Sequence, residues 1–248
     1  MLSNASRRPH GRRRQEESSA QQAMAQFSHE LRNCLGTARS AMRVLEMRDL
    51  ELSRRKKTRK LIGRQLEQMS RLVDDLLDAS LIRSGRLRLE RARTDLREVL
   101  AHAAEAVDFL IQQRSHRLQV LQPDIPVWIH GDAARLEQVF VNLLTNAAKY
   151  TDAGGAITAS IQSLEHEVIV AIRDTGIGIA PDVLPHVFDR YVRANQASGP
   201  GGLGLGLPLV RSLVEGHGGR VEVASDGAGC GSEFKVRLPR GATAETFE

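Results

Sequence analysis

The chain has 248 residues, a length that allows one large domain or two smaller ones. Its apolar content of 41% and charged content of 26% are ordinary for a globular protein and exclude wholesale disorder. The formal net charge of +5 does not indicate a nucleic-acid-binding face, because five arginines and no acidic residue lie within residues 1–15. We expect residues 1–20 to form a basic, disordered tail, with contact to an anionic surface or nucleic acid as the alternative.

The cysteine and hydropathy patterns favour a cytoplasmic location. Cys34 and Cys230 stand far apart and match neither a disulfide framework nor a metal-binding spacing, which favours a reducing compartment. No apolar run approaches the about 20 residues that span a bilayer, and the N-terminus lacks the apolar stretch of a signal peptide. We therefore expect any membrane-bound sensor to lie on a separate polypeptide or in a missing segment.

Residues 21–86 show the pattern of a helical hairpin. Apolar residues spaced alternately by three and four predict a first helix from about residue 15 to residue 47, and a second helix follows a break at 49–52. The first seam comprises Met24, Phe27, Leu31, Cys34, Ala38, Ala41 and Leu45, widened by Leu35 and Met42. The second comprises Ile62, Leu66, Met69, Val73, Leu76 and Ser80. A lone hairpin cannot bury both seams, so we expect a homodimer in which two hairpins form a four-helix bundle.

Beyond residue 86 the pattern changes to mixed helices and strands, so the predicted fold class is α+β. Alternating Leu87 and Leu89 predict a short strand. Further strands are expected over 127–130, 156–163, 168–174, 220–224 and 233–238, and helices over 95–112, 132–150 and 208–217. These elements predict an α/β sandwich over residues 87–240 with its own core, followed by a tail over 241–248.

Two glycine-rich segments lie in this second part. The segment Asp174-Thr175-Gly176-Ile177-Gly178 follows an apolar strand, so the Asp174 carboxylate can accept a hydrogen bond from an adenine amino group at the sheet edge. The segment 201–206 leads into an apolar helix, whose free N–H groups can bind phosphate. It is neither a Walker loop nor a dinucleotide fingerprint. A plain turn and a flexible linker are the alternatives.

A polar helix face and one histidine complete the set of candidate residues. Asn142, Asn146 and Lys149 share one face of the predicted helix, where an amide oxygen can bind Mg²⁺ and a lysine can offset phosphate charge. Ordinary surface amides are the alternative. His29 takes heptad position f when Met24 is a, so it faces solvent, and a neutral imidazole there can attack phosphorus. The alternative is an exposed histidine without a role.

These motifs, in this order, resemble the sensor histidine kinases of the Bergerat-type ATPase superfamily. Asn142 begins the N box, Asp174–Gly178 is the G1 box, Gly202–Gly206 is the G2 box, Phe188–Tyr191 resembles the F box and His29–Leu35 the H box. The resemblance implies ATP and Mg²⁺ as cofactors, with the metal held through Asn142. The nucleotide-binding residues it implies are Asn142, Asn146, Lys149, Tyr150, Asp174, Gly176, Gly178, Ile179, Arg190, Gly202, Leu203, Gly204, Leu205 and Gly206.

The resemblance also implies the activity. ATP would donate its γ-phosphoryl group to His29, assisted by Glu30, and the group would pass to an aspartate on the receiver domain of a response regulator. Glu30 and Asn33 match the family's phosphatase pattern, in which Asn33 would position water. Cys34 departs from the family, which usually has proline there and a kinked helix.

Two other functions remain as alternatives. A hydrolytic ATPase of the gyrase or chaperone kind resembles this chain, but those relatives carry a glutamate one helical turn before the N-box asparagine, and this chain has Gln138. An amide is not a general base. A catalytically silent dimeric scaffold is the second alternative, and Asp174, Asn142 and His29 count against it.

Overall fold

The computed structural model describes residues 9–47, 51–84, 88–189 and 204–240, with the side chains of only some residues in the two long N-terminal helices. The chain divides into two compact units, Met1–Leu81 and Ile82–Glu248. The sequence-based boundary at residues 86 and 87 falls just after this division.

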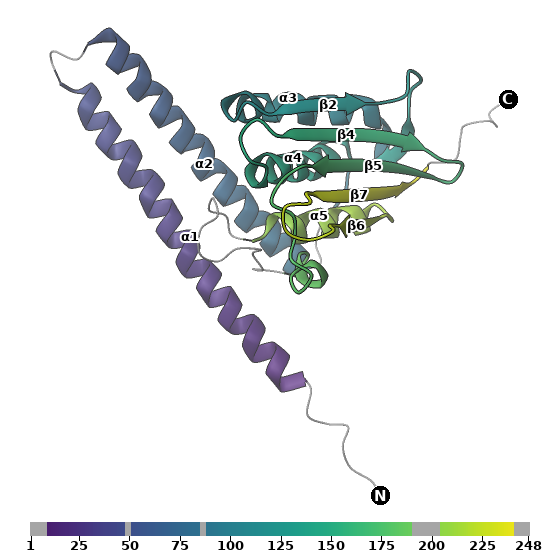
Figure 1. Ribbon diagram of the computed structural model, residues 1–248. Coiled ribbons are helices and arrows are strands. Elements are labelled where there is room, and N and C mark those ends of the chain that lie inside the picture. The colour runs from purple at the N-terminus through teal and green to yellow at the C-terminus, as the bar shows by residue number, and fades with distance from the viewer. Residues whose placement is uncertain (1–8, 48–50, 85–87, 190–203, 241–248) are drawn as a thin grey trace, which may run out of the picture. The chain divides into compact units, whose positions relative to one another are not determined.

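The first unit consists of two long helices, α1 (Pro9–Leu45) and α2 (Leu52–Ser84). Figure 1 shows them leading away from a short link with opposite chain directions, as expected for a helical hairpin. α1 begins at Pro9, earlier than the start near residue 15 that the apolar spacing predicted, so residues 9–20 of the expected tail are helical. Proline suits the first helical turn, and the Arg, Gln, Glu and Ala residues that follow are good helix formers. Residues 1–8 of the expected tail lie outside the described residues.

The seam of α1 is only partly covered within one chain. Cys34 and Ala41 are buried, at 3% and 5% exposure, whereas Leu35 and Met42 remain 52% and 49% exposed. α1 continues through Cys34 without interruption, in line with the missing proline. The widened part of the seam is therefore an uncovered apolar stripe.

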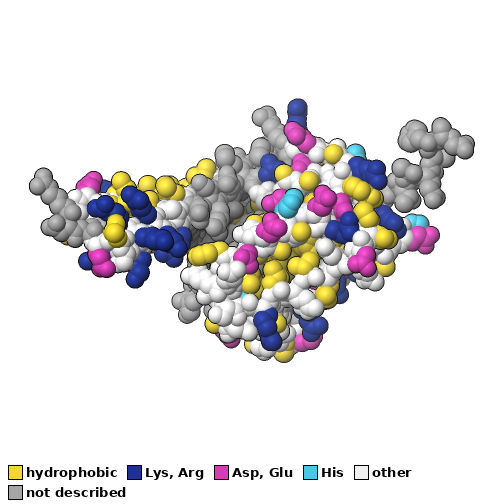
Figure 2. All heavy atoms as spheres, turned by 90° about the horizontal axis from the view of Figure 1, so that it is seen from above, with side chains coloured by type: hydrophobic (Ala, Val, Ile, Leu, Met, Phe, Trp, Pro, Cys, Tyr) yellow, Lys and Arg dark blue, Asp and Glu magenta, His cyan; other side chains and the backbone are white. Residues whose placement is uncertain are grey.

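The start of α2 is strongly cationic. Figure 2 shows lysine and arginine side chains gathered at the link end of the helical unit. The exposed members of this group are Arg54, Lys56, Lys57, Arg59 and Lys60. Their exposure agrees with a solvated helix end, and their position at a helix N-terminus opposes the helix dipole.

The second unit is built on a five-stranded sheet with the order β2-β4-β5-β7-β6. Its strands are β2 (Arg117–Leu121), β4 (Ala156–Ser163), β5 (Glu167–Asp174), β6 (Arg220–Ala224) and β7 (Ser232–Pro239). β2 pairs with β4 in parallel, and every other neighbouring pair in this sheet is antiparallel. The central strands lie close to the bounds that the alternating pattern predicted.

Three helices cover one face of this sheet, as Figure 1 shows: α3 (Leu96–Gln113), α4 (Ala133–Tyr150) and α5 (Gly206–Gly216). The face of α4 turned to the core is apolar. It buries Val139, Phe140, Leu143, Leu144 and Ala147. A single 3₁₀ turn among the described residues, η1 (Leu184–His186), precedes the segment that is not described.

The strand expected around Leu87 and Leu89 is wrong. Leu87 lies outside the described residues, and residues 88–91 are not in a strand. The strand here is β1 (Ala92–Asp95), which pairs with β3 (Trp128–Gly131) in a separate two-stranded sheet. β1 and β2 were both missed. β1 carries the short polar sequence Ala-Arg-Thr-Asp, in which only the last two side chains are buried, so it has little alternating apolar signal.

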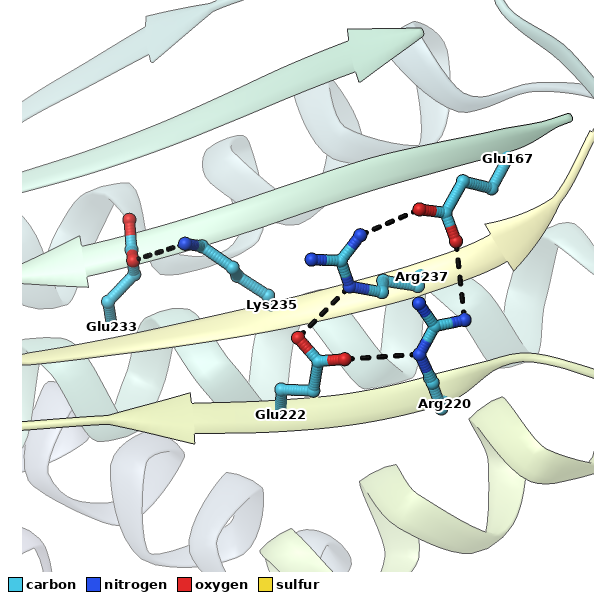
Figure 3. Close-up of polar contacts among 6 residues, drawn as sticks. All are labelled: Glu167, Arg220, Glu222, Glu233, Lys235 and Arg237. Carbon is cyan, nitrogen blue, oxygen red and sulfur yellow. Dashed lines mark hydrogen bonds and ion pairs between the residues drawn. The ribbon is translucent and has the colours of Figure 1, made fainter. Parts of the chain in front are cut away.

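The sheet face away from the helices carries a ring of alternating charges, drawn in Figure 3. Arg237 on β7 donates to Glu167 on β5 at 2.7 Å and to Glu222 on β6 at 3.0 Å. Arg220 closes the ring, with contacts of 3.1 Å to Glu222 and 3.3 Å to Glu167. The hydrogen bond from Arg237 lowers the pKa of the Glu222 carboxyl. The ring joins three strands and offsets the repulsion between Arg220 and Arg237, which are opposite each other in register.

Candidate functional site

The end of β5 delivers a buried carboxylate. Asp174 is 5% exposed, and its Oδ1 accepts a hydrogen bond from the backbone N–H of Gly176 at 2.8 Å. Its Oδ2 accepts from the hydroxyl of Ser232 at 2.5 Å. Asp174 and Ser232 are direct partners in the β5–β7 register. Both carboxylate oxygens are thus held in place, and each keeps further acceptor capacity for a ligand.

The loop after Asp174 is joined to the end of α4. The N–H of Ile177 donates to the carbonyl of Tyr150 at 3.0 Å. A Cβ at position 176 would lie 2.3 Å from that same carbonyl oxygen and 2.8 Å from Asp174 Oδ1. Glycine is therefore required for this close approach of the loop to α4. This contact brings Tyr150 next to the Asp174 loop, as its assignment to the site requires.

A second loop, residues 225–231 between β6 and β7, holds the Asp174 loop from the other side. Gly178 has φ of +69°, and a Cβ there would lie 1.9 Å from the carbonyl oxygen of Gly227. The Ser225 hydroxyl accepts from the N–H of Ile179 at 2.9 Å, and Gly231 N–H donates to Gly176 at 3.1 Å. We call residues 225–231 the clasp loop. It keeps Gly178 and Ile179 in fixed positions.

The start of α5 faces Asn142. A Cβ on Gly206, the first residue of α5, would lie 3.4 Å from Asn142 Oδ1. The N-cap residue Leu205 makes no side-chain capping hydrogen bond, and Gly204 before it has φ of +65°. Backbone N–H groups at such a helix start have no intrahelical partners and carry partial positive charge. The N box and the G2 box therefore meet at this point.

The C-terminal end of α4 is anchored from the turn between α3 and β2. Arg114 Nη1 donates to the carbonyls of Lys149 and Thr151 at 3.1 and 3.3 Å, and His116 Nε2 lies 3.0 Å from the carbonyl of Ala148. A guanidinium at a helix C-terminus is favourable to the helix dipole. Asn142, Asn146 and Lys149 are all half-buried on the solvent side of this anchored helix, which agrees with the shared face anticipated for them.

The N-terminal end of α4 is anchored by a buried histidine. His217 is 3% exposed, and its Nε2 accepts from the backbone N–H of Asp132 at 3.0 Å, while its Nδ1 lies 2.7 Å from the carbonyl of Leu213. Asp132 caps α4 through Arg135 N–H at 3.1 Å and accepts from Glu90 N–H at 2.9 Å. Burial lowers the pKa of His217. A neutral ring suits this position, since Nε2 must supply a lone pair.

Gln138 lies one turn before Asn142 on α4. Its side-chain carbonyl accepts a hydrogen bond from Arg135 Nη1 at 2.9 Å. The amide is thus held by a neighbour on its own helix. A side-chain amide is not a general base, so Gln138 does not take a proton from water.

The helical unit presents His29 to solvent. The side chain is exposed, as heptad position f predicts, and its Nδ1 lies 3.1 Å from Nδ2 of Asn33 one turn later. Glu30 lies in α1, and its side chain is outside the described part of the chain. His29 and Asn33 are therefore brought together by the helix itself.

Some of the candidate residues lie outside the described ranges. These are Arg190, Gly202 and Leu203, together with Tyr191 and Gly201 of the same motifs. Within the described ranges, no group of three or more His, Cys, Asp or Glu residues is placed to hold a metal ion. Any metal here would depend on amide oxygens and on the ligand.

Sequence reasoning missed the supporting residues Ser225, Ser232, Arg114 and His217. Glycines at 227, 229 and 231 were the available signal for the clasp loop, because glycine at every second position is typical of a tight, positive-φ turn. Ser232, by contrast, is identified only by its register opposite Asp174.

Two family models match the chain in the order of its two units. The His Kinase A (phospho-acceptor) domain matches residues 19–85, and the histidine kinase-, DNA gyrase B- and HSP90-like ATPase matches residues 131–242. The first contains His29, and the second contains the Asp174 loop, Asn142 and the start of α5. The chain therefore carries the two domains of a histidine kinase catalytic core.

Relatives of this histidine kinase core include sensor kinases from distant bacteria. The sensor histidine kinase TrcS of Mycobacterium tuberculosis is 39% identical over 184 residues, which cover 72% of this chain and 35% of TrcS. The signal transduction histidine-protein kinase BaeS of Escherichia coli is 34% identical over 223 residues, which cover 87% of this chain and 46% of BaeS. The kinase core thus spans less than half the length of these relatives.

Solved structures agree with the fold. The mycobacterial sensor histidine kinase MprB superposes with a TM-score of 0.55 at 28% identity, over 61% of this chain and 100% of that one. The histidine kinase AdeS of Acinetobacter baumannii superposes with a TM-score of 0.62 over 86% of this chain and 98% of that one. At 24% identity, AdeS supports the fold alone. In the described part of the kinase core, no helix is long and apolar enough to cross a membrane.

Proposed function

We propose that this core transfers the γ-phosphoryl group of ATP to His29 and then to an aspartate on the receiver domain of a response regulator. The observation that carries the proposal is the close approach of the start of α5 to Asn142. A Cβ added at Gly206 would lie only 3.4 Å from Asn142 Oδ1. Asp174 lies in the same unit. An uncapped helix start beside a neutral oxygen ligand is suited to a nucleotide phosphate and its metal.

The polar groups of this unit are suited to the parts of an ATP molecule. The Asp174 carboxylate accepts from the adenine amino group, and its own partners, Gly176 and Ser232, hold it rigid. The N–H groups of the α5 start bind phosphate oxygens, and Lys149 offsets phosphate charge. Asn142 provides the neutral oxygen for Mg²⁺, which suits an ion that keeps waters and phosphate oxygens as its other ligands. Bound ATP with Mg²⁺ supplies the phosphoryl group, and the chain supplies position and charge. ATP is a cytoplasmic substrate, so we place the core in the cytoplasm.

The core acts as a homodimer in this proposal. Exposed apolar side chains remain on both helices of the first unit: Met24, Leu35 and Met42 on α1, and Leu66 and Val73 on α2. Their spacings of seven and eleven residues place those of each helix on one stripe. A second copy of the hairpin covers both stripes and completes a four-helix bundle.

The partner that receives the phosphoryl group is a response regulator. One structural relative, the histidine kinase ThkA, was solved in complex with the response regulator protein TrrA. His29 is exposed on α1 and accessible to such a partner. Asn33 lies beside it, and we extend the proposal to a phosphatase activity in which Asn33 positions water against the regulator's phosphoaspartate.

The test is incubation with γ-labelled ATP and Mg²⁺, followed by mapping of the label. Label that is acid-labile and lies on His29 supports the proposal. His29→Ala should abolish labelling and leave nucleotide affinity nearly unchanged, because the two sites lie in different units. His166→Ala, which removes another exposed imidazole, serves as the control and should label normally. Full labelling of His29→Ala would refute the acceptor assignment, and no labelling of the unaltered protein would favour a silent scaffold.

A further inference from the structure

The contact between Asn33 and His29 has a defined polarity. The Asn33 Nδ2 group carries only hydrogens, so across the 3.1 Å contact it donates and His29 Nδ1 accepts. A neutral imidazole has one N–H and one lone pair. With the lone pair on Nδ1 engaged by Asn33, the proton of the neutral ring lies on Nε2. Residues four apart on a helix face each other, so the helix itself maintains this pairing.

A ring that carries a phosphoryl group on Nε2 presents the same lone pair on Nδ1. The contact with Asn33 therefore persists after phosphorylation at Nε2. With the Asn33 amide in this orientation, the contact is lost when Nδ1 gains a proton, because two N–H groups would then face each other. Asn33 thus stabilises the forms of His29 in which Nε2 is substituted and Nδ1 is unprotonated.

We propose that Asn33 is a positioning residue that keeps Nδ1 of phosphorylated His29 unprotonated and thereby lengthens the lifetime of the phosphohistidine. The proposal rests on His29 being the phosphoacceptor. It concerns the kinase in the absence of any receiver domain, and so differs from a role for Asn33 in positioning water on a regulator.

The chemistry of phosphoryl loss explains the effect. In hydrolysis the bond between phosphorus and Nε2 breaks, its electron pair goes to the ring, and a water oxygen bonds to phosphorus to give inorganic phosphate. When Nδ1 is protonated, the ring leaves as neutral imidazole. When Nδ1 is unprotonated, the ring must leave as an anion or take a proton at Nε2 as it leaves, which is slower. Opposing protonation of Nδ1 therefore slows the loss.

The same contact has the opposite effect on the forward reaction. In the resting ring it keeps the proton on Nε2, the nitrogen that must attack phosphorus. Before the bond from Nε2 to phosphorus forms and the bond from phosphorus to the ADP oxygen breaks, that proton must leave Nε2 or move to Nδ1. Asn33 thus slows formation of the phosphohistidine as well as its loss.

Asn33→Asp is the sharpest test, because it keeps the side-chain shape and reverses the hydrogen bond. A carboxylate accepts from Nδ1–H, so this variant should label faster than the unaltered protein and lose its label faster. Asn33→Ala should show a smaller acceleration of loss. One exposed hydrogen bond corresponds to a change of about twofold to tenfold in each rate. The control Thr37→Asp places the same charge one turn further along α1, on an exposed residue, and should change neither rate.

The measurements are label loss from purified, ADP-free phosphoprotein at several pH values, and the ¹⁵N shifts of the unphosphorylated His29 ring. We expect the Nε2–H tautomer in the unaltered protein and the Nδ1–H tautomer in Asn33→Asp. Phosphoramidate, which phosphorylates accessible imidazoles without ATP, gives the lifetime on His29 even when the kinase reaction fails. Equal lifetimes in the unaltered protein and both Asn33 variants would overturn this inference and leave the proposed kinase activity intact. Absence of ATP-dependent label would overturn the activity alone.

Discussion

Ser232 donates a hydrogen bond to Asp174 across the β5–β7 pair at 2.5 Å, although 58 residues separate the two in the chain. The partner of the carboxylate that we propose binds adenine therefore comes from the last strand of the chain. Their register, rather than any local motif, sets the orientation of the Asp174 side chain.

Asp174→Asn should weaken ATP binding and leave the helical unit unaffected. An amide cannot offer adenine the same charged acceptor, and loss of a charge-assisted hydrogen bond is worth roughly 1.5–3 kcal/mol, or about tenfold to a hundredfold in affinity. Ser232→Ala removes only the partner of Oδ2 and should weaken binding less. Titration with a fluorescent ATP analogue measures both. Equal affinity for Asp174→Asn and the unaltered protein would contradict the role of Asp174.

Gly178→Ala should destabilise the second unit more than Gly227→Ala. Both glycines have positive φ, at +69° and +112°, but a Cβ at 178 would lie 1.9 Å from a backbone oxygen, whereas a Cβ at 227 has no neighbour within 4 Å. Both changes carry the strain of positive φ, about 1–2 kcal/mol, and only the first adds overpacking of about 1–3 kcal/mol. Thermal unfolding of the two variants, measured side by side, tests whether the clasp loop packs closely against Gly178. Equal losses would show that it does not.

The second unit should lose stability as the pH falls below about 6.5, the ordinary pKa of histidine. Burial lowers the pKa of His217 in the folded state and the nearby charge of Arg91 adds to this, while the hydrogen bond to the Leu213 carbonyl and the charge of Asp132 oppose it. Above about pH 6.5 the ring is neutral in both states. Below it, the unfolded chain binds a proton that the folded state resists, so the free energy of unfolding falls.

Urea unfolding between pH 5 and 8 measures this dependence. His217→Gln should be less stable throughout and show a flatter pH dependence. His166→Gln, at an exposed histidine, should keep the slope of the unaltered protein. A slope that survives in His217→Gln would assign the effect to another group.

Without a receiver domain, ATP turnover should stop near one phosphoryl group per protomer, because no carboxylate lies one turn before Asn142. Gln138→Glu alone should add little hydrolysis, since Arg135, 2.9 Å from the Gln138 oxygen, pairs with the new carboxylate and reduces its basicity. Gln138→Glu with Arg135→Ala should hydrolyse ATP faster than either single variant. A phosphate-release assay distinguishes them, and His29 labelling should not require the carboxylate. Many turnovers by the unaltered protein would favour the hydrolase alternative.

The elements with strong periodicity could be predicted from sequence. The apolar face of α4 and the alternation along β4 gave their positions closely, because burial on one face leaves a regular pattern. β1 was missed because its four residues carry little apolar signal, and β2 was missed because a five-residue edge strand gives only a short alternation. The early start of α1 was missed because a highly charged helix start has the same composition as a disordered tail.

The candidate site was predicted where a side chain or a glycine has a local signature, as with Asp174, Gly176 and His29. Its supports depend on contacts between distant segments. Ser225 and Gly227 contact the Asp174 loop from the turn that joins β6 to β7, and Arg114 reaches the end of α4 from the C-cap of α3. Such contacts follow from topology and register, which the sequence pattern of one segment does not contain.

Asp174 and Ser232 are paired in the sheet, so residues 175–231 between them form a long connection whose two ends are held together. This connection contains the second glycine-rich segment, α5 and β6. The entropy of closing such a loop grows only slowly with its length, by about 0.6 kcal/mol for each doubling. Insertions or deletions between Asp189 and Gly204 should therefore leave the adenine end of the site intact. Evolution can then alter the length of that stretch without remaking the strands that hold Asp174 and Ser232 together.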